Sequence, residues 1–252
     1  MITTRILMLS PDTSTAAAVR ATPRPMLSHV CTTLLVVLGL LAFVGLSPLQ
    51  TQAQEVDITP GIKGGVNFAD LGGDDAELIF DGGGSGDFEI PIEARTGIVA
   101  GGFALIDFDG PFALQPEVLY VQKGAKVEIE FLEETASSTL KLDYIEVPVL
   151  AKFQIPLEGS IAPNIFAGPA VAFNITAEQE GEGPDGSETT DLSEVISTTD
   201  FGLQVGAGVD FDAGPGTIML DARYELGLSS IPSEGDADIK NQGIRITAGF
   251  GF

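Results

Sequence analysis

Eight segments of the chain alternate apolar residues with polar or small ones at a period of two. In "DFGLQVGAGVDF", residues 200–211, every second side chain from Phe201 to Phe211 is apolar, and Asp, Gly or Gln fills the other positions. A period of two places successive side chains on opposite faces of a strand, whereas a helix repeats every 3.6 residues. The pattern therefore predicts an all-β chain. The eight segments are 61–69, 95–106, 112–126, 140–153, 161–174, 200–211, 217–228 and 243–252.

Turn residues separate these segments in a regular way. Three connections, "DFDGP", "QIPLEGS" and "DAGPG", are short and contain the Gly and Pro residues that favour tight turns. The other four connections are long, at about residues 70–93, 127–139, 177–199 and 229–242. Short and long connections alternate in transmembrane barrels, whose even strand number leaves both termini on one side of the membrane. We therefore predict an eight-stranded antiparallel up-and-down transmembrane β-barrel, with a lipocalin-like barrel or a sandwich as the alternative.

A long apolar run precedes the strands. Residues 30–46, "VCTTLLVVLGLLAFVGL", carry no charge, follow Arg20 and Arg24, and precede small residues at Thr51 and Ala53. This order is typical of a secretory signal peptide, and we place cleavage after Ala53. The prediction divides the chain into an N-terminal extension with signal peptide, residues 1–53, and a barrel domain, residues 54–252. The alternative is a single transmembrane anchor, although the run is short for a span and no basic stop signal follows it.

Composition limits the chemistry available to this chain. The formal net charge is −24, with 36 acidic residues against 12 Lys and Arg, which argues against nucleic acid as a partner. The only His is His29 and the only Cys is Cys31, so neither residue type occurs in residues 54–252. Thiol catalysis, disulfides, His-based triads and the usual zinc ligand sets are therefore excluded for the mature chain. We predict a protein that is not an enzyme and that needs no cofactor.

Charged residues also occur within the strand segments, on the side opposite the apolar face. Four acids and four bases hold such positions, so their charges balance. Charges removed from water need partners, and eight strands enclose a lumen narrow enough for side chains to fill. The sequence therefore predicts an ion-pair network in the lumen and no metal site. The predicted members are Glu117, Lys123, Glu146, Lys152, Asp221, Arg223, Glu225 and Arg245.

Two of these acids have a catalytic alternative. Glu117 and Glu146 could form a carboxylate pair of the kind that glycoside hydrolases use. Lys123 and Lys152 occupy matching positions nearby, and this placement favours structural salt bridges.

The excess negative charge falls in the long connections, which hold 22 acidic residues against Lys240 alone. In residues 177–199, four carboxylates could collect calcium, because hard cations take several carboxylate oxygens. EF-hand or RTX spacing is missing there, so a solvated acidic loop is the favoured interpretation. The four carboxylates are those of Glu178, Glu180, Glu182 and Asp185.

Six stretches within or overlapping the strand segments follow one another along the chain, with Phe252 last. They are "GIKGGVNFADL", "FALQPEVLYVQKGAK", "LDYIEVPVLAKF", "FAGPAVAF", "DFGLQVGAGVDF" and "ARYELGL". In order and spacing they resemble the PorT-type outer-membrane β-barrel domain common in Bacteroidetes and relatives. The resemblance covers nearly all of residues 54–252 and implies an eight-stranded outer-membrane barrel. One branch of that family is associated with type IX secretion and gliding, but most members have no assigned activity. The acidic load exceeds what the family leads us to expect, and we attribute it to a high-salt habitat.

These observations predict an outer-membrane protein with a structural, anchoring or interaction role, which presents acidic loops to the exterior. Expected partners are outer-membrane lipid, the barrel-insertion machinery, and a protein at the loops or on the periplasmic side. The last segment, "GIRITAGFGF", should pair with the first strand, and the resemblance implies that Phe252 belongs to the signal for insertion. Two alternatives stay open. One is a small passive pore, and the other is a soluble secreted barrel whose apolar faces enclose a ligand.

Overall fold

The computed structural model describes residues 56–74, 92–108, 110–131, 134–157, 159–183, 186–232 and 237–252. The predicted signal peptide, its cleavage site and Asp185 lie outside these residues. Residues from Glu55 onward form one compact unit. Within the described ranges, no helix has the length and hydropathy needed to cross a membrane.

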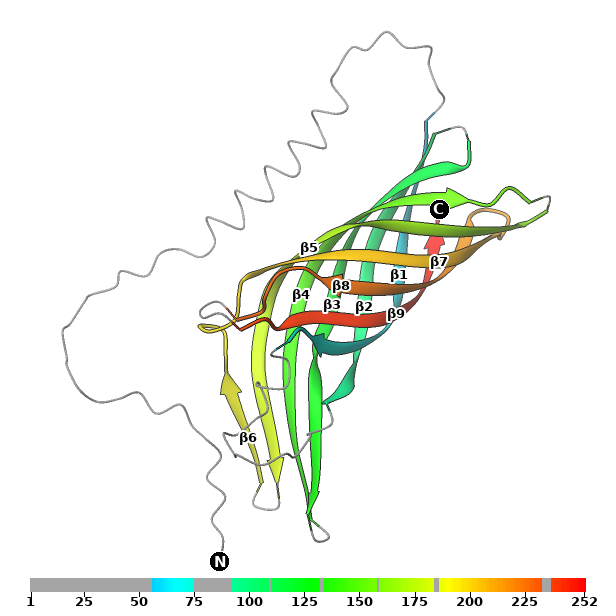
Figure 1. Cartoon of the computed structure of the whole chain (residues 1–252). Coiled ribbons are helices and arrows are strands. Elements are labelled where there is room, and N and C mark those ends of the chain that lie inside the picture. The colour runs from blue at the N-terminus through cyan, green and yellow to red at the C-terminus, as the bar shows by residue number, and fades with distance from the viewer. Residues whose placement is uncertain are drawn as a thin grey trace, which may run out of the picture. The chain divides into compact units, whose positions relative to one another are not determined.

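Nine antiparallel strands make up the described chain (Figure 1). Eight of them form a closed ring in the order β1, β2, β3, β4, β5, β7, β8, β9, with β9 pairing back onto β1. The predicted eight-stranded antiparallel barrel is confirmed, and each predicted segment overlaps one strand of the ring. The strands are β1 (Asp57–Gly72), β2 (Ile92–Asp107), β3 (Phe112–Phe131), β4 (Glu134–Gln154), β5 (Ile161–Gly183), β6 (Gly186–Asp191), β7 (Thr199–Asp212), β8 (Thr217–Gly227) and β9 (Lys240–Gly251).

Closure of the ring explains the last segment of the sequence. Ile246 of β9 lies opposite Val66 of β1, and the pairing continues from Gly61 to Gly72. Beyond β9, the Phe252 backbone N–H donates to the Pro60 carbonyl oxygen at 2.9 Å. Both strands therefore lose their free edges, which in an open sheet would expose unpaired backbone groups.

Two of the four long connections were predicted wrongly. Residues 127–139 are mostly strand, because β3 and β4 continue as a hairpin in which Val127 pairs with Ser138. In residues 177–199, β5 runs on to Gly183 and the extra strand β6 pairs with it. At the end of β3, Ala125 and Val127 alternate with Lys126 and Glu128, so this part of the strand was open to prediction from hydropathy and was missed. Strand β6 has no apolar residue, and hydropathy gives no sign of it. We call residues 125–131, 134–141, 176–183 and 186–191 the strand extension.

A glycine marks the place where the barrel wall gives way to the strand extension. Gly124 has a φ of +118°, a conformation that side chains with a Cβ rarely adopt. A Cβ built there would lie 2.0 Å from the Leu140 carbonyl oxygen on the neighbouring strand. Gly124 therefore allows β3 to change direction without breaking its pairing with β4.

One end of the barrel has an apolar core. The connection between β8 and β9 places Ile231 and Ile239 against Leu140, Leu142 and Tyr144, all of which are buried. The Ile231 N–H donates to the Ile239 carbonyl oxygen at 2.8 Å, which fixes this connection as a closed loop. We call this the hairpin end, and the opposite end, where the three tight connections lie, the short-turn end.

Candidate functional site: the charged lumen

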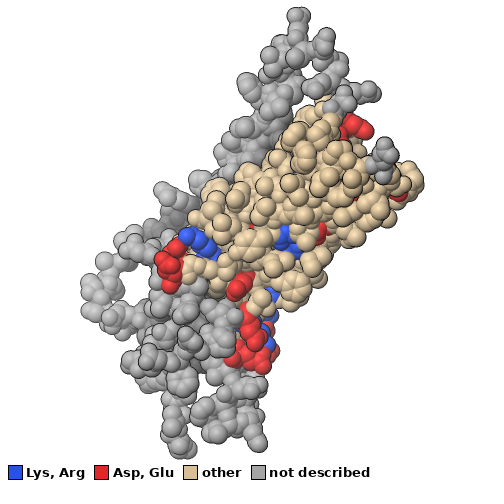
Figure 2. Space-filling view, turned by 45° about the vertical axis from the view of Figure 1, so that its right-hand side comes forward, with Lys and Arg blue, Asp and Glu red and all other residues tan. Residues whose placement is uncertain are grey.

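The wall of the barrel is apolar outside and polar inside. On β7, the Val205 side chain is 53% exposed, whereas its neighbour Gln204 is completely buried. Asp200 and Asp210 on the same strand are also buried. In Figure 2 uncharged residues form most of the wall in view, and acidic residues gather mainly toward its ends. The alternation seen in the sequence therefore has its polar members in the lumen.

Large apolar side chains that are more than a third exposed come from seven strands of the ring, and those of β4, such as Ile145 and Val147, are half-buried. On β2 the expectation that Val99, Phe103 and Leu105 form the outward apolar face was wrong. These side chains are buried in the lumen and Ile98 faces outward, because both parities of this strand are apolar. The outward set on the other strands includes Ile62, Val66, Val118, Ile165, Phe201, Leu203, Leu220, Leu226, Ile244 and Ile246, each more than a third exposed.

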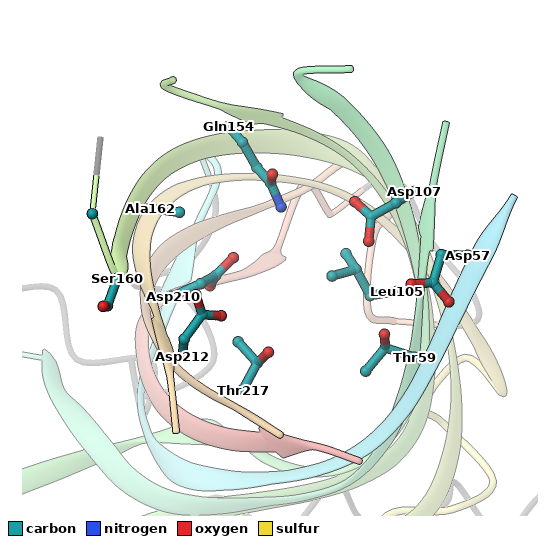
Figure 3. Close-up of a pocket in the computed structure, with 11 residues that line it drawn as sticks. Asp57, Thr59, Leu105, Asp107, Gln154, Ser160, Ala162, Asp210, Asp212 and Thr217 are labelled. Atoms are coloured by element: carbon teal, nitrogen blue, oxygen red, sulfur yellow. The ribbon is translucent and has the colours of Figure 1, made fainter. Parts of the chain in front are cut away.

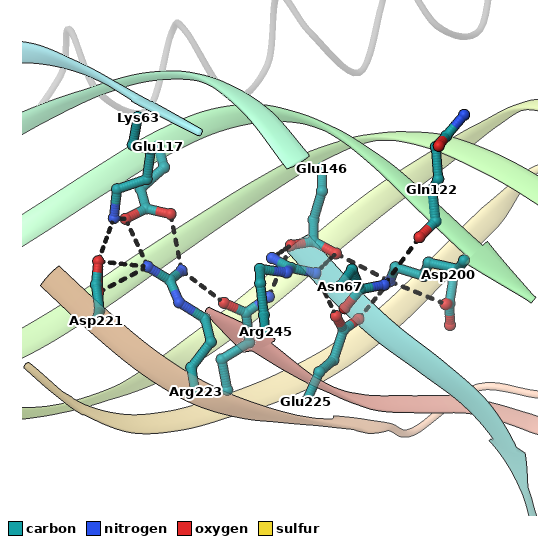
Figure 4. Close-up of polar contacts among 12 residues, drawn as sticks. Lys63, Asn67, Glu117, Gln122, Glu146, Asp200, Asp221, Arg223, Glu225 and Arg245 are labelled. Carbon is teal, nitrogen blue, oxygen red and sulfur yellow. Dashed lines mark hydrogen bonds and ion pairs between the residues drawn. The ribbon is translucent and has the colours of Figure 1, made fainter. Parts of the chain in front are cut away.

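The first charged group in the lumen centres on Glu117 (Figure 4). Its carboxylate accepts from Lys63 Nζ at 2.7 Å and from Arg223 NH1 at 2.8 Å. The Lys63 and Arg223 cations also contact Asp221, at 2.9 and 3.3 Å. Glu117 lies on β3 and Arg223 on β8, which are four strands apart in either direction around the ring. This group therefore spans the full width of the lumen.

The second charged group centres on Glu146. Its two oxygens contact Arg245 NH1 at 2.7 Å and Lys123 Nζ at 2.9 Å. The same two cations contact Glu225, Arg245 doing so through NH2 at 2.7 Å. Glu146 on β4 and Arg245 on β9 also stand on opposite sides of the ring. Two acids and two bases thus alternate in a closed cycle across the lumen.

A glutamine joins the two groups. The Gln204 amide donates to Glu146 at 2.7 Å and accepts from Arg223 NH1 at 3.1 Å. Beyond the second group, Asp200 accepts from Asn241 at 2.8 Å and from the Ser229 hydroxyl at 2.6 Å. Polar contacts therefore run along the lumen up to the apolar core of the hairpin end.

The short-turn end of the lumen is open and acidic. A cavity of about 260 Å³ opens there, and the carboxylates of Asp57, Asp107, Asp210 and Asp212 line it (Figure 3). Lys152 lies at this end and pairs with Asp210 at 2.8 Å. The cavity is thus acidic, with one buried ion pair at its inner side.

Seven of the eight predicted residues meet in the linked network, and Lys152 stands apart from it with Asp210. Lys63, Asp200 and Asp210 were not among the predicted members, although each occupies the polar position of an alternating segment. The uncharged members of the network were not predicted, because the prediction considered only charged residues. They are Gln115, Gln204, Asn241 and Thr247.

The geometry favours a structural role for these acids. Glu117 and Glu146 each contact two cationic side chains, so neither carboxylate is available to act as a general acid or base. In the strand extension, Glu180 pairs with Lys141, and Glu178 and Glu182 follow the same face of β5. Among the described residues, no group of three or more His, Cys, Asp or Glu side chains is placed to hold a metal ion.

The family model described as outer membrane protein beta-barrel domain matches residues 52–232. No curated protein sequence matches the chain.

Several solved structures are similar in fold. Ail, the attachment invasion locus protein of Yersinia pestis, solved with the heparin analogue sucrose octasulfate, is 16% identical and covers 78% of this chain and 99% of its own, with a TM-score of 0.38. Neisserial surface protein A is 12% identical with the same coverage and a TM-score of 0.39. The N-terminal barrel domain of Pseudomonas aeruginosa OprF is 10% identical, covers 77% of this chain and 97% of its own, and has a TM-score of 0.33.

Proposed function

The chain belongs to the outer-membrane protein β-barrel domain family, and on that premise we propose that it is a closed outer-membrane barrel that anchors an interaction surface outside the membrane. The observation that carries this proposal is the inverted wall, in which apolar side chains such as Val205 face outward while Gln204 and Arg223 are buried. In water such a wall would expose a large apolar surface, whereas in a bilayer it is solvated by lipid. A soluble ligand-binding barrel would need the opposite arrangement.

The orientation follows from the lengths of the connections at the two ends of the barrel. Residue Asp57 and residue Phe252 both lie at the short-turn end. In bacterial outer-membrane barrels that end faces the periplasm and the longer connections face the exterior. The strand extension, with Glu178, Glu180 and Glu182, then stands outside the cell. This placement supports acidic exterior surfaces as the site where a partner protein binds.

A passive pore is the weaker alternative. The ion pairs of Glu117 with Arg223 and of Glu146 with Arg245 cross the lumen from one wall to the other. The apolar core around Ile231 and Ile239 lies in series with them at the hairpin end. A hydrated ion would have to disrupt both layers to pass, so we assign the protein no transport role.

Two finer parts of the proposal rest on the sequence. The order of motifs supports a relationship to PorT-type barrels, one branch of which is associated with type IX secretion, and the acid-rich composition supports a high-salt habitat. Phe252 is exposed at the end of the closing strand, where insertion machinery could reach it. Its ring centroid lies 5.4 Å from that of Phe250. We include an insertion role for Phe252 in the proposal.

Gel mobility tests the membrane assignment. The protein is produced from its full-length chain, purified, and compared boiled and unboiled after refolding in detergent micelles and in detergent-free buffer. We expect a heat-sensitive mobility shift in micelles only. A folded, monodisperse protein in plain buffer would overturn the proposal.

A matched pair of variants sharpens this test. Val205 and Val195 are 53% and 55% exposed, but Val205 lies in the middle of β7 and Val195 lies in the connection before it. Arg near the middle of a lipid-facing strand costs about 2–4 kcal/mol, so Val205→Arg should reduce insertion into vesicles strongly and Val195→Arg should not. Equal insertion of the two variants would contradict a lipid-facing wall.

A further inference from the structure

The wall formed by β3, β4 and β5 is much longer than the opposite wall. These strands contain 20, 21 and 23 residues, whereas β8 and β9 contain 11 and 12. The Tyr120 hydroxyl donates to Asp143 at 2.6 Å on the outward face, where apolar side chains give way to polar ones. The strand extension continues as a sheet beyond the ends of the shorter strands (Figure 1). On this face it carries the polar side chains of Lys126, Thr139 and Glu180.

The last strand of this sheet is β6. It pairs with β5 from Glu178 opposite Asp191 to Gly183 opposite Gly186, and no other strand of the described chain pairs with it. All six residues of β6 are exposed. Its second edge therefore presents backbone N–H and C=O groups that are free to pair with another extended chain.

Acidic side chains surround this edge on both faces. Residues directly opposite in an antiparallel pair share a face, so Asp191 lies beside Glu178. Glu180 and Glu182 extend the same face along β5, and Glu188 projects from the other face of β6. Hydrogen bonds from the Ser193 hydroxyl and backbone N–H lower the pKa of Asp191, so this carboxylate is charged at neutral pH. Lys141 pairs with Glu180, and Lys126 and Arg95 lie close enough to interact electrostatically with Glu182 and Glu180 respectively.

The acidic side chains around the edge determine which kind of strand can pair with it. A second copy of β6 would bring the same two acids, Glu188 and Asp191, and no base to this acidic edge, and like charges on neighbouring strands are destabilising. A strand with Lys or Arg at alternate positions would meet acids on the same face instead. Thr189 and Thr190 between the acids are residues with a good propensity for strands.

We propose that the free edge of β6 docks an extended basic segment of a partner protein, which adds to the strand extension as a further antiparallel or parallel strand. This inference rests on the proposed function, because it names the kind of partner that the exterior surface takes. Main-chain hydrogen bonds supply affinity in such strand addition, and side-chain charge supplies selectivity.

The test uses fluorescent synthetic peptides and the full-chain protein purified in micelles. The probe is an eight-residue peptide of alternating Lys and Thr, whose binding is followed by fluorescence anisotropy. Two control peptides accompany it: one with Glu in place of Lys, and one with Lys and Thr but with alternate backbone nitrogens methylated. We expect the unmodified basic peptide to bind and both controls to bind at least about tenfold more weakly, since each lacks one of the two recognition elements.

Two proline variants locate the edge. Adjacent strand residues direct their N–H groups toward opposite edges, so of Thr189→Pro and Thr190→Pro one removes an N–H from the free edge and the other removes an N–H that faces β5. Glu182→Lys combined with Glu188→Lys should weaken peptide binding about tenfold, and Asp212→Lys at the short-turn end should leave it unchanged. Because β6 lies outside the ring, all these variants should keep the heat-sensitive mobility shift.

The outcomes separate the docking edge from the membrane assignment. Equal binding of the methylated peptide, or unchanged binding by both proline variants, would refute strand addition. A concentration-dependent dimer that the proline variants abolish would also overturn the proposal, since a second copy would then occupy the edge. Loss of the mobility shift in the parent protein would instead refute the membrane barrel itself.

Discussion

Replacing Glu146 by Gln tests whether the lumen network stabilises the barrel. Glu146 is completely buried, and its carboxylate contacts Lys123 at 2.9 Å, Arg245 at 2.7 Å and the Gln204 amide at 2.7 Å. Gln has nearly the same volume, so the substitution removes the charge and opens no cavity. Lys123 and Arg245 would then share Glu225 as their nearest acid, with Asp200 at 3.9 Å from Lys123.

The expected loss of unfolding free energy follows from leaving a buried charge without its partner. Removing one partner of a buried ion pair costs about 3–5 kcal/mol, because the remaining cation stays out of water without its counter-charge. The matched control is Glu180→Gln, which makes the same chemical change in the partly exposed pair with Lys141. Exposed pairs contribute at most about 1 kcal/mol. The two variants should therefore differ several-fold in their loss of unfolding free energy.

The assay is the fraction of fast-migrating folded barrel on an unboiled gel as urea is raised, with the protein in lipid vesicles. A second substitution provides a rescue: Lys123→Gln added to Glu146→Gln leaves Arg245 paired with Glu225. The double variant should lose less stability than the sum of the single variants. A Glu146→Gln barrel as stable as the Glu180→Gln barrel would refute the reasoning.

Three other outcomes follow from the structure. Gly124→Ala should lose about 1–3 kcal/mol of unfolding free energy, since an Ala there is strained at a φ of +118°, while Gly183→Ala, with open space around it, should change little in the same urea titration. Phe252→Ala should lower the amount of barrel inserted in cells yet leave refolding in micelles unchanged; a parallel loss in micelles would assign Phe252 to stability. In a planar bilayer the protein should give no regular conductance steps, because cross-lumen pairs such as Glu117 with Arg223 fill the barrel, and stepwise conductance would show that the lumen opens.

Local alternation of apolar and polar residues was sufficient to predict most of the strands of the barrel. Each of the eight ring strands could be located from hydropathy, since Phe201, Leu203 and Val205 must face one way and Asp200 and Gln204 the other. The same argument placed Glu117 and Glu146 on the polar side. Alternation gave the wrong outward face for β2, where both parities are apolar and Val99 faces the lumen. The end of β3 was missed although Ala125 and Val127 alternate with Lys126 and Glu128, and β6 was missed because it has no apolar residue.

Side-chain direction in a strand depends only on parity. The order of residues was therefore enough to predict eight strands, an apolar outer wall for most of them, and acids and bases together on the opposite face. Which charged side chains form ion pairs depends on the tertiary structure. Glu146 was expected near Lys123 and Lys152, yet it contacts Lys123 and Arg245, while Lys152 contacts Asp210. These partners depend on the register of all eight strands and on closure between β1 and β9, and such long-range relations leave no periodic trace along the chain.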